Sequence, residues 1–392
     1  MTEKIRVAMI MGKWVGGGVE AVVMNYYKHI DTNILQFDFI FDSDSRDVPI
    51  DYLKSRGSKI YFIPPYNKPI YYHKSLKKIL KDGQYKIVHS HINTLSVFSL
   101  FAAKCAKVPI RIAHSHSTTN SKEKGKNLLK QLLRPFSKTF ATEYMTCSEL
   151  AGRWLFGDKA YDSGNVYLLN NAIETKKFTY NFAIRQEMRK SFGISDSKLV
   201  IGHIGRFVAQ KNHDFLIDIF YEIYRNNSDS MLVLAGEGPL LQQIKDKVKS
   251  LGISSAVQFL GQRSDAPSLY QMFDVFLLPS LYEGLPVVGV ESQAAGLLCI
   301  FSDDMTYETK VLKTTKFLSL EQNAKEWAKY ILSSYAKFER KDTSREVESY
   351  GFEITTEAKK LEMKYLELWK RVYSSTNQSE KSLPFSLNRS SD

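Results

Sequence analysis

Two glutamates, Glu283 and Glu291, are the residues of this chain best suited to bind a ligand. They lie in residues 277–295, LLPSLYEGLPVVGVESQAA, where a buried strand is followed by a glycine turn and the start of a helix. In an open α/β sheet ligands bind at the carboxyl ends of strands, and a helix N-terminus offers free N–H groups that suit phosphate. An ionised carboxylate only accepts hydrogen bonds, so two carboxylates beside a phosphate are suited to sugar hydroxyls. The segment therefore predicts a ligand with both phosphate and sugar.

A second set of phosphate-binding residues follows another predicted strand. Residues 205–212 read GRFVAQKN, so Gly205 comes directly after a strand and two cations follow it. The planar guanidinium of Arg206 matches phosphate oxygens, and Lys211 adds a mobile point charge. Together they could hold a diphosphate and stabilise it as it leaves, because charge develops there in the transition state. Two solvated surface cations are the alternative, but the position at a strand end argues against it.

A glycine-rich turn, KWVGGGVE at residues 13–20, follows the first predicted strand. Its glycines let a ligand approach the backbone closely, and the next helix offers its N-terminus. The spacing G-x-G-x-x-A from Gly16 also matches a dinucleotide fingerprint loosely, and Asp42 or Asp44 could supply the acid that such a site needs. A glycine turn that binds nothing is the third interpretation.

Residues 259–265, FLGQRSD, form another strand end in the same half of the chain as the two glutamates. Backbone polar groups next to Gln262 and Arg263 could pair there with the edge of a nucleobase. An ordinary loop is nearly as good an interpretation of this segment.

Four histidines occur as two pairs, His89-Ser90-His91 and His114-Ser115-His116, each at the end of a predicted strand. Alternation along a strand points both members of a pair to the same side. A zinc site is one interpretation, but no nearby acid or cysteine supplies a clear further ligand. We therefore expect hydrogen-bonding histidines at a cleft, some of them purely structural, and no metal.

Composition limits the class of protein. The 392 residues carry 54 Lys and Arg against 42 Asp and Glu, a net charge of +12, which fits nucleic acid, an anionic membrane or phosphorylated small molecules as partners, or simply a basic surface. No apolar run approaches the ~20 residues that cross a bilayer. The N-terminus leads straight into a strand without a signal peptide, and the three cysteines lie far apart, so we expect a cytoplasmic protein without disulfides. Nucleic acid is not expected, because basic and aromatic residues do not alternate as on such surfaces.

Short apolar runs alternate with helical-period segments, which is typical of βαβ units and parallel sheets. The boundary between two such series is expected in the polar segment 174–196, and an apolar face recurs along a last helix at 356–373. We predict domains at 1–175 and 176–355, the helix at 356–373, and a disordered tail at 374–392. The thirteen predicted strands span residues 6–11, 37–41, 59–62, 87–89, 111–114, 143–147, 166–169, 200–204, 231–235, 257–260, 275–278, 298–301 and 315–318.

These motifs together resemble the retaining glycosyltransferases of the GT-B fold, the large nucleotide-sugar-dependent family that includes bacterial capsule, exopolysaccharide and lipopolysaccharide enzymes. The resemblance covers roughly residues 5–372, and its most specific element is the glutamate pair within EGLPVVGVES. It implies two Rossmann-like domains that face each other across a cleft, the first (1–175) binding the acceptor and the second (176–355) binding the nucleotide sugar. The last helix is expected to cross back to the first domain. In the family, the first glutamate and adjacent amides hold the donor sugar, which implies Glu283, Gly284 and Leu285, and the second glutamate, here Glu291, binds the ribose.

The resemblance also assigns the diphosphate to Arg206 and Lys211, beside Gly205. It places the donor phosphates and the acceptor against Gly16 and Gly17.

A histidine at a strand end of the first domain contacts the donor sugar in this family. That role falls to His116 or His114, with His116 preferred. One departure from the family pattern is Asn171, where the family usually has glycine, and Glu174 then follows at a shifted position, so this turn is left out of the catalytic set.

The implied function is transfer of a hexose or N-acetylhexosamine from a nucleotide sugar, most often UDP-linked, to a saccharide acceptor, with retention and without a metal or cofactor. A lipid-diphosphate-linked acceptor is expected because residues 120–138 form a basic amphipathic segment suited to anionic headgroups on the inner face of the plasma membrane. An ordinary helix with its leucines in the core is the alternative for that segment. For the whole chain, the alternatives are a sugar-nucleotide epimerase of related fold and a non-catalytic sugar-nucleotide-binding partner of another transferase.

Overall fold

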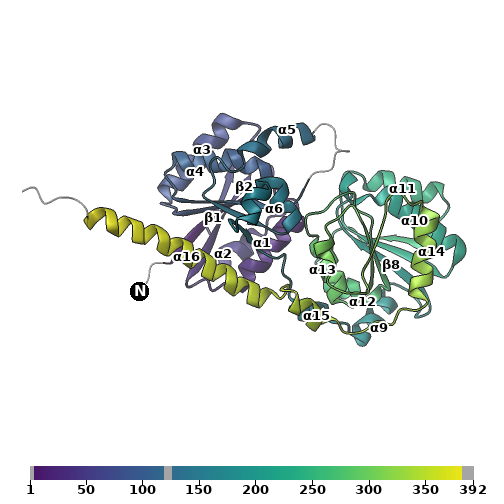
Figure 1. Cartoon of the computed structure of the whole chain (residues 1–392). Helices are drawn as coiled ribbons and strands as arrows, with labels where there is room; N and C mark the ends of the chain where they lie inside the picture. Colours follow the sequence, from purple (N-terminus) through teal and green to yellow (C-terminus); the bar gives the residue numbers. More distant parts are fainter. Residues whose placement is uncertain (1–3, 119–125, 382–392) are drawn as a thin grey trace, which may run out of the picture.

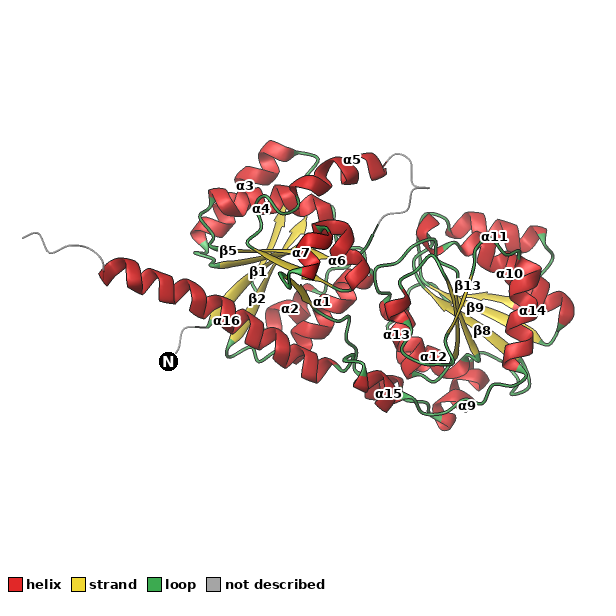
Figure 2. Ribbon diagram, in the orientation of Figure 1, coloured by secondary structure: helices red, strands yellow, loops and turns green. Residues whose placement is uncertain are grey.

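The structure is a computed structural model that describes residues 4–118 and 126–381. It consists of two parallel β-sheets, each covered by helices on both faces (Figures 1 and 2). The first sheet has the order β3-β2-β1-β4-β5-β6-β7, and the second has the order β10-β9-β8-β11-β12-β13. Both orders reverse next to the first strand of their domain, at β1/β4 and at β8/β11, which is where open α/β sheets bind ligands.

All thirteen predicted strands are present, which confirms the predicted α/β class with two Rossmann-like sheets. Buried apolar side chains on both faces explain why the strands were readable as short apolar runs: Val7 and Met9 of β1 pack on one face of the sheet and Ala8 on the other. The strands are β1 (Ile5–Gly12), β2 (Leu35–Asp42), β3 (Ile60–Ile63), β4 (Ile87–Ser90), β5 (Ile110–Ser115), β6 (Glu143–Thr146), β7 (Val166–Leu168), β8 (Leu199–Ile204), β9 (Ser230–Ala235), β10 (Val257–Phe259), β11 (Val275–Leu278), β12 (Leu298–Ser302) and β13 (Lys316–Leu318).

In the first domain, α3 and α4 cover one face of the sheet, and α1, α2 and the C-terminal helix cover the other (Figure 2). The helices of this domain are α1 (Gly18–His29), α2 (Ile50–Ser55), α3 (Pro69–Asp82), α4 (Ser96–Cys105), α5 (Lys126–Leu133), α6 (Glu149–Phe156) and α7 (Asp158–Asp162), with 3₁₀ turns η1 (Asn93–Leu95) and η2 (Arg134–Phe136). Within the described segments, no helix combines the length and the apolarity needed to cross a bilayer.

In the second domain, α10, α11 and α14 pack on one face of the sheet, and α12 and α13 pack on the other. Its helices are α8 (Thr175–Phe178), α9 (Phe182–Ser191), α10 (His213–Asn226), α11 (Leu241–Ser250), α12 (Ala266–Met272), α13 (Val287–Ala294), α14 (Ala324–Tyr335) and α15 (Ser344–Ser349), with 3₁₀ turns η3 (Ala209–Lys211), η4 (Ser254–Ala256) and η5 (Tyr307–Thr309).

The C-terminal helix α16 (Ile354–Lys381) runs along the first domain, where it packs against α1 (Figure 1). Leu361, Tyr365 and Leu368 are buried as their spacing predicted. The chain passes from one domain to the other twice. The two connecting segments lie side by side, because Ile173 forms a parallel β-bridge with Glu353. The helix continues through residues 374–381, which the sequence assigned to a disordered tail, because the polar residues there contain no glycine or proline to end it. Residues 382–392 of that predicted tail lie outside the described residues.

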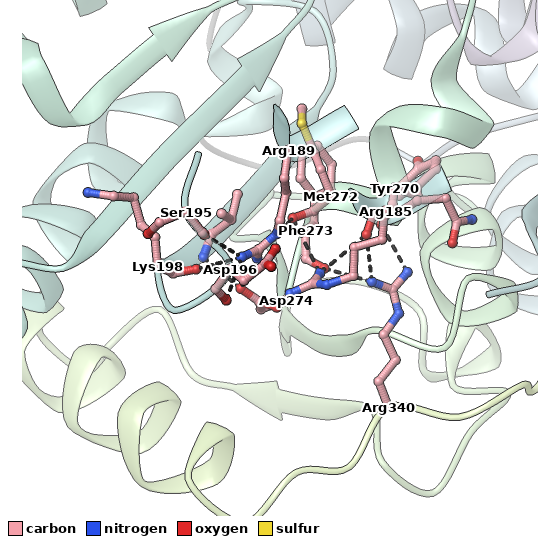
Figure 3. Close-up of polar contacts among 12 residues, drawn as sticks. Arg185, Arg189, Ser195, Asp196, Lys198, Tyr270, Met272, Phe273, Asp274 and Arg340 are labelled. Atoms are coloured by element: carbon pink, nitrogen blue, oxygen red, sulfur yellow. Dashed lines mark hydrogen bonds and ion pairs between the residues drawn. The ribbon is translucent and has the colours of Figure 1, made fainter. Parts of the chain in front are cut away.

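The polar segment predicted to separate the domains packs onto the second sheet instead of forming an exposed linker. Arg185 and Arg189 of α9 each donate to a different oxygen of Asp274, both at 2.6 Å (Figure 3). The same carboxylate accepts the backbone N–H of Val200 at the start of β8, and Arg340 donates to main-chain carbonyls around it. This network fixes the edge of the sheet opposite to the carboxyl ends of its strands.

Candidate active site

The first predicted pair of site residues meets at the switch point of the second sheet. The chain leaves β8, passes through η3, and turns into α10 at Asn212, whose φ is 54°. This turn brings Lys211 Nζ within 2.6 Å of Glu283 Oε1. Gln210 Nε2 donates to the other oxygen of Glu283 at 3.1 Å and to Tyr282 O at 3.0 Å. Two groups predicted to bind the ligand, one the diphosphate and one the sugar, therefore bind each other in this structure.

Gln210 is a site residue that the sequence analysis missed. Its backbone carbonyl also accepts from Leu281 N at 2.8 Å, so this residue joins the loop after β8 to the loop after β11. Its position directly before Lys211 was the available signal, but its partner Glu283 lies 73 residues away in the chain, on another loop.

Glycines form the wall of the site beside Lys211. Gly236 has a φ of +139°, and a Cβ on it would clash with the carbonyl oxygen of Gly205. A Cβ on Gly205 would in turn lie 3.4 Å from Lys211 Cε. Side chains at these positions would fill the space next to the ammonium group. Arg206 is exposed, and its guanidinium forms no hydrogen bond or ion pair with the described residues, so it is available to a ligand.

Glu291 lies about one turn into α13 and is mostly buried. Its Oε2 accepts a hydrogen bond from Tyr270 OH at 2.9 Å. Burial raises the pKa of Glu291 to about 7, and the Tyr270 hydrogen bond opposes this shift. Its carboxyl group therefore changes protonation near neutral pH. Tyr270 was not predicted, because only the packing of α12 against α13 brings the two residues together.

The glycine loop of the first domain reaches the second domain through one predicted partner. A Cβ on Gly16, whose φ is +68°, would lie 2.9 Å from Gln262 Nε2, so these two predicted site residues are neighbours. Arg263 instead forms a 2.6 Å ion pair with Asp265 on the surface, and the described residues show no contact between it and the other predicted site residues.

Glu20 binds the backbone of the glycine loop. Its carboxylate accepts the backbone N–H groups of Val15 at 3.0 Å and of Gly17 at 3.1 Å, and it is buried. This arrangement caps the N-terminus of α1. Two of the loop amides that the sequence analysis offered to phosphate are thus already bonded to a carboxylate, so close approach of a ligand falls to the remaining backbone around Gly16.

The four histidines form one buried cluster, with both members of each pair on the same side of the sheet as predicted. His114 and His116 stack at 3.9 Å between ring centroids, and His89 and His91 stack at 4.1 Å. His89 Nε2 pairs with His114 Nδ1 at 3.0 Å, and His91 Nδ1 pairs with His116 Nε2 at 2.9 Å. Burial lowers the pKa of every ring, that of His116 to about 3, so the cluster is neutral at physiological pH.

This cluster meets the second domain through the backbone of His116. A Cβ on Gly284 would overlap the carbonyl oxygen of His116, so the turn that carries Glu283 lies directly against the end of β5. His114 lies two residues earlier, within β5, and its bonded neighbour, His89, also pairs with Tyr365 OH of α16 at 2.6 Å. Nitrogen atoms of His89, His91 and His114 lie within 4.8 Å of one another, but the group contains imidazoles only.

Asn171 also joins the two domains. Its Nδ2 donates to the carbonyl of Leu285 at 2.6 Å, and the side chain is buried. This turn lies outside the predicted catalytic set because Asn171 replaces the glycine that is usual in the family. The asparagine side chain forms a hydrogen bond to Leu285, a predicted donor-binding residue. Leu285 itself is buried, and its carbonyl is already bonded to Asn171.

A cavity of about 280 Å³ opens beside this arrangement in the first domain. It lies at the carboxyl ends of β1, β2 and β4 and extends to α5. The described residues that line it include Asp42, a candidate acid of the alternative dinucleotide site, but none of the residues assigned to the donor. They are Met11, Gly12, Lys13, Asp42, Tyr66, Tyr72, Ile92, Asn93, Thr94, Leu95, Ser117, Thr118, Lys130 and Trp154.

Comparison with known proteins identifies the class that this fold and site define. Residues 184–346 match the model of the family described as glycosyl transferases group 1, and residues 16–177 match glycosyltransferase family 4. The chain is 35% identical over 337 residues to EpsF of Bacillus subtilis strain 168, assigned as a glycosyltransferase, covering 84% of this chain and 88% of that protein. The chain belongs to the glycosyltransferases of the GT-B family.

More distant relatives agree with this family and with the fold. An Escherichia coli UDP-Gal:α-D-GlcNAc-diphosphoundecaprenol α-1,3-galactosyltransferase is 26% identical over 311 residues, 76% of this chain and 80% of that protein. The crystal structure of Anabaena Alr3699/HepE with UDP and glucose superposes with a TM-score of 0.76 at 15% identity, covering 92% of this chain and 99% of that one. The glycosyltransferase WaaG, involved in lipopolysaccharide biosynthesis, superposes with a TM-score of 0.72 at 14% identity, covering 91% and 98%.

Proposed function

We propose that this glycosyltransferase moves a hexose or N-acetylhexosamine from a UDP-sugar to a hydroxyl of a lipid-diphosphate-linked saccharide during synthesis of a bacterial capsular or exopolysaccharide. The observation that carries the proposal is the pairing of Lys211 with Glu283 at the switch point of the second sheet, against the first domain through Gly284. The E. coli relative uses a UDP-sugar and a diphosphoundecaprenol-linked acceptor by name, and the HepE structure holds UDP and glucose. Both support the same donor class here.

In the proposed reaction, binding of a UDP-sugar breaks the contact between Lys211 and Glu283. Groups of the donor then become the partners of both side chains. The diphosphate takes the ammonium group of Lys211 and the guanidinium of Arg206, and sugar hydroxyls donate to the oxygens of Glu283. The ribose hydroxyls donate to Glu291. Two positive charges then face the oxygen from which the sugar departs, so the proposal assigns no metal to this step.

The proposed stereochemistry is retention by a same-face reaction. The bond from the anomeric carbon to the diphosphate oxygen breaks, the bond to the acceptor oxygen forms on the same face, and the leaving diphosphate oxygen takes the acceptor proton. Retaining glycosidases use a carboxylate nucleophile instead. Both carboxylates of this site have other proposed partners, the donor sugar for Glu283 and the ribose for Glu291. The neutral histidines contribute hydrogen bonds and no charge, because their pKa values lie far below neutrality.

We also propose that α5 holds the enzyme on an anionic membrane surface. The leucines of this helix are not in the core: Leu128, Leu129 and Leu132 are 65%, 44% and 60% exposed. Lys130 and Arg134 lie on the same segment and are suited to lipid phosphates. The part of the predicted segment before residue 126 lies outside the described residues.

Flotation with vesicles tests membrane binding. Wild-type protein should float with vesicles that contain phosphatidylglycerol and remain in solution with purely zwitterionic vesicles. The double variant Leu128→Ser/Leu132→Ser should lose flotation without a change in thermal stability, because both side chains are exposed. Equal flotation of wild type and variant would contradict the role of α5.

A screen of nucleotide sugars tests the donor class. A UDP-sugar that binds the native state should raise the melting temperature, while GDP- and ADP-sugars should not. Product analysis then separates the remaining alternatives. An epimerase would convert the donor sugar without any acceptor, and a non-catalytic binding partner would be stabilised by the donor without releasing UDP.

A further inference from the structure

The cavity in the first domain contains a carboxylate that the proposed donor site does not use. Asp42 ends β2 at the wall of this cavity and is 5% exposed. Its side chain forms no hydrogen bond or ion pair with any described residue. Asp44, two residues later, is exposed and forms a 2.6 Å ion pair with Lys13 instead. The end of β2 thus carries one carboxylate with an ion-pair partner, Asp44, and one without a hydrogen-bond or ion-pair partner among the described residues, Asp42.

Gly12 keeps the space beside Asp42 open. Its φ is +67°, and a Cβ on it would lie 4.0 Å from Asp42 Oδ2 and 2.8 Å from Ile92 Cγ2. Burial raises the pKa of Asp42 to about 6, with a further increase from Asp44 and an opposing effect of Lys13. A buried carboxylate without donors is unfavourable unless a ligand supplies them. Ligand hydroxyl groups are donors of the required kind.

The rest of the cavity suits a sugar ring. Tyr66 and Trp154 offer aromatic surface, and the buried Tyr72 hydroxyl, which forms no hydrogen bond with the described residues, offers a further polar group. The volume of about 280 Å³ lies at the small end of the ~300–1,000 Å³ of typical ligand sites. One sugar ring is a better match to that volume than a dinucleotide, the ligand that an acid after the second strand would otherwise indicate.

The cavity also leads to the donor site. Ser117 lines it and directly follows His116, and a Cβ on Gly284 would lie 3.0 Å from Ser117 Cα. Lys130 of α5 also lines it, so the cavity reaches the helix that carries the exposed leucines. A saccharide in the cavity would therefore have the donor turn at one end and the lipid-facing helix at the other.

We propose that this cavity binds the terminal, uncharged sugar ring of the acceptor, and that Asp42 accepts hydrogen bonds from its hydroxyl groups and so selects the acceptor. The inference rests on the proposed glycosyltransferase reaction. It adds the subsite for the second substrate and the residue that recognises it.

The test compares Asp42→Asn with the matched control Asp44→Asn. The probes are octyl β-glucoside, octyl β-galactoside and octyl β-N-acetylglucosaminide, offered with each UDP-sugar that stabilises the protein. Transfer to the probe and hydrolysis of the donor are measured separately. Asp42→Asn should raise the acceptor KM at least tenfold and leave donor hydrolysis within twofold of wild type, and Asp44→Asn should change neither.

Direct binding keeps the test independent of turnover. Saturation-transfer NMR should detect at least one octyl glycoside on wild-type protein and lose it in Asp42→Asn. Tyr66→Leu, a change at the cavity wall, should weaken the same signal if Asp42→Asn does not fold. Unchanged acceptor KM and unchanged NMR signal in Asp42→Asn would overturn the inference, as would a lack of any glycoside binding to wild type.

Two outcomes separate this inference from the proposed function. Glycoside binding that depends on Asp42, in a protein that no UDP-sugar stabilises, would retain the cavity as a sugar site and reject the proposed donor. Stabilisation of wild type by NAD⁺ that disappears in Asp42→Asn would assign the carboxylate to a nucleotide ribose and reject the acceptor subsite.

Discussion

Replacing Lys211 by methionine should lower both the stability of the protein and the rate of transfer, for separate reasons. The ammonium group lies 2.6 Å from Glu283 Oε1, and the two side chains are 15% and 9% exposed. Removing one partner of a buried ion pair costs about 3–5 kcal/mol, because the other charge stays buried. We expect the lower end, about 3 kcal/mol, because Gln210 still donates to the second oxygen of Glu283.

The loss of rate comes from the diphosphate. A charge-assisted hydrogen bond contributes about 1.5–3 kcal/mol, which corresponds to roughly tenfold to a hundredfold in turnover. The double variant Lys211→Met/Glu283→Gln removes both charges, so it should recover most of the stability but none of the activity. Arg206→Ala should lose a similar factor in turnover with no loss of stability, because Arg206 is exposed and has no partner among the described residues.

Urea unfolding and release of UDP at saturating donor measure the two effects. If Lys211→Met unfolds at the wild-type urea concentration, the ion pair contributes nothing to the native state. If Arg206→Ala and Lys211→Met both keep near-normal turnover, neither cation stabilises the leaving diphosphate and the proposed mechanism is wrong.

Three further variants test other parts of the structure. The pKa of Glu291 is raised from 4.5 to about 7, so the contribution of this group to stability is fully present below pH 4.5 and is lost, by roughly 3 kcal/mol, as pH rises through 7; Glu291→Gln should remove this slope in urea unfolding and also the gain in donor affinity expected as the carboxyl ionises. Asp274→Ala leaves the buried Arg189 and the partly buried Arg185 without their partner and should cost about 3–5 kcal/mol of unfolding free energy. Asp229→Ala, at an exposed ion pair, should change it by less than about 0.5 kcal/mol. Gly236→Ala should lower the melting temperature more than Gly252→Ala, because both have positive φ but only the first Cβ meets another atom; equal effects would show that backbone conformation alone sets the cost.

The strands were predictable because burial on both faces leaves a local signature. A strand such as β11 is apolar and buried at every residue, so it appears as an apolar run wherever its neighbours lie in the chain. The strand ends that carry Glu283, Lys211 and the histidines were predictable for the same reason, because parallel sheets place their carboxyl ends along one edge. The two-domain arrangement was implied by the family resemblance, whereas the strand order within each sheet was not predicted.

The pairings within the site were not predictable from local pattern. Gln210 with Glu283, Tyr270 with Glu291, and Asn171 with Leu285 join segments that only the folded chain brings together. The solvent exposure of the α5 leucines was not predictable either, since their spacing fits a buried helix face as well as a solvent-facing one. Asp42 was noticed as a strand-end acid, but only the cavity distinguishes it from Asp44.

The bridge between Ile173 and Glu353 determines how the two domains can move. Ile173 N donates to Phe352 O at 2.9 Å, and Ile354 N donates to Ile173 O at 3.0 Å, so the chain passes between the domains twice at one place. Two hydrogen-bonded connecting segments are expected to act as a hinge. They resist sliding and separation of the domains and leave rotation of one domain about the hinge as the motion of lowest cost. A small rotation there changes the distance between Gly284 and His116 while α16 keeps its place on the first domain. We infer that such a rotation would open and close the cleft by breaking and remaking contacts such as the Asn171–Leu285 hydrogen bond, while the packing of either sheet stays unchanged.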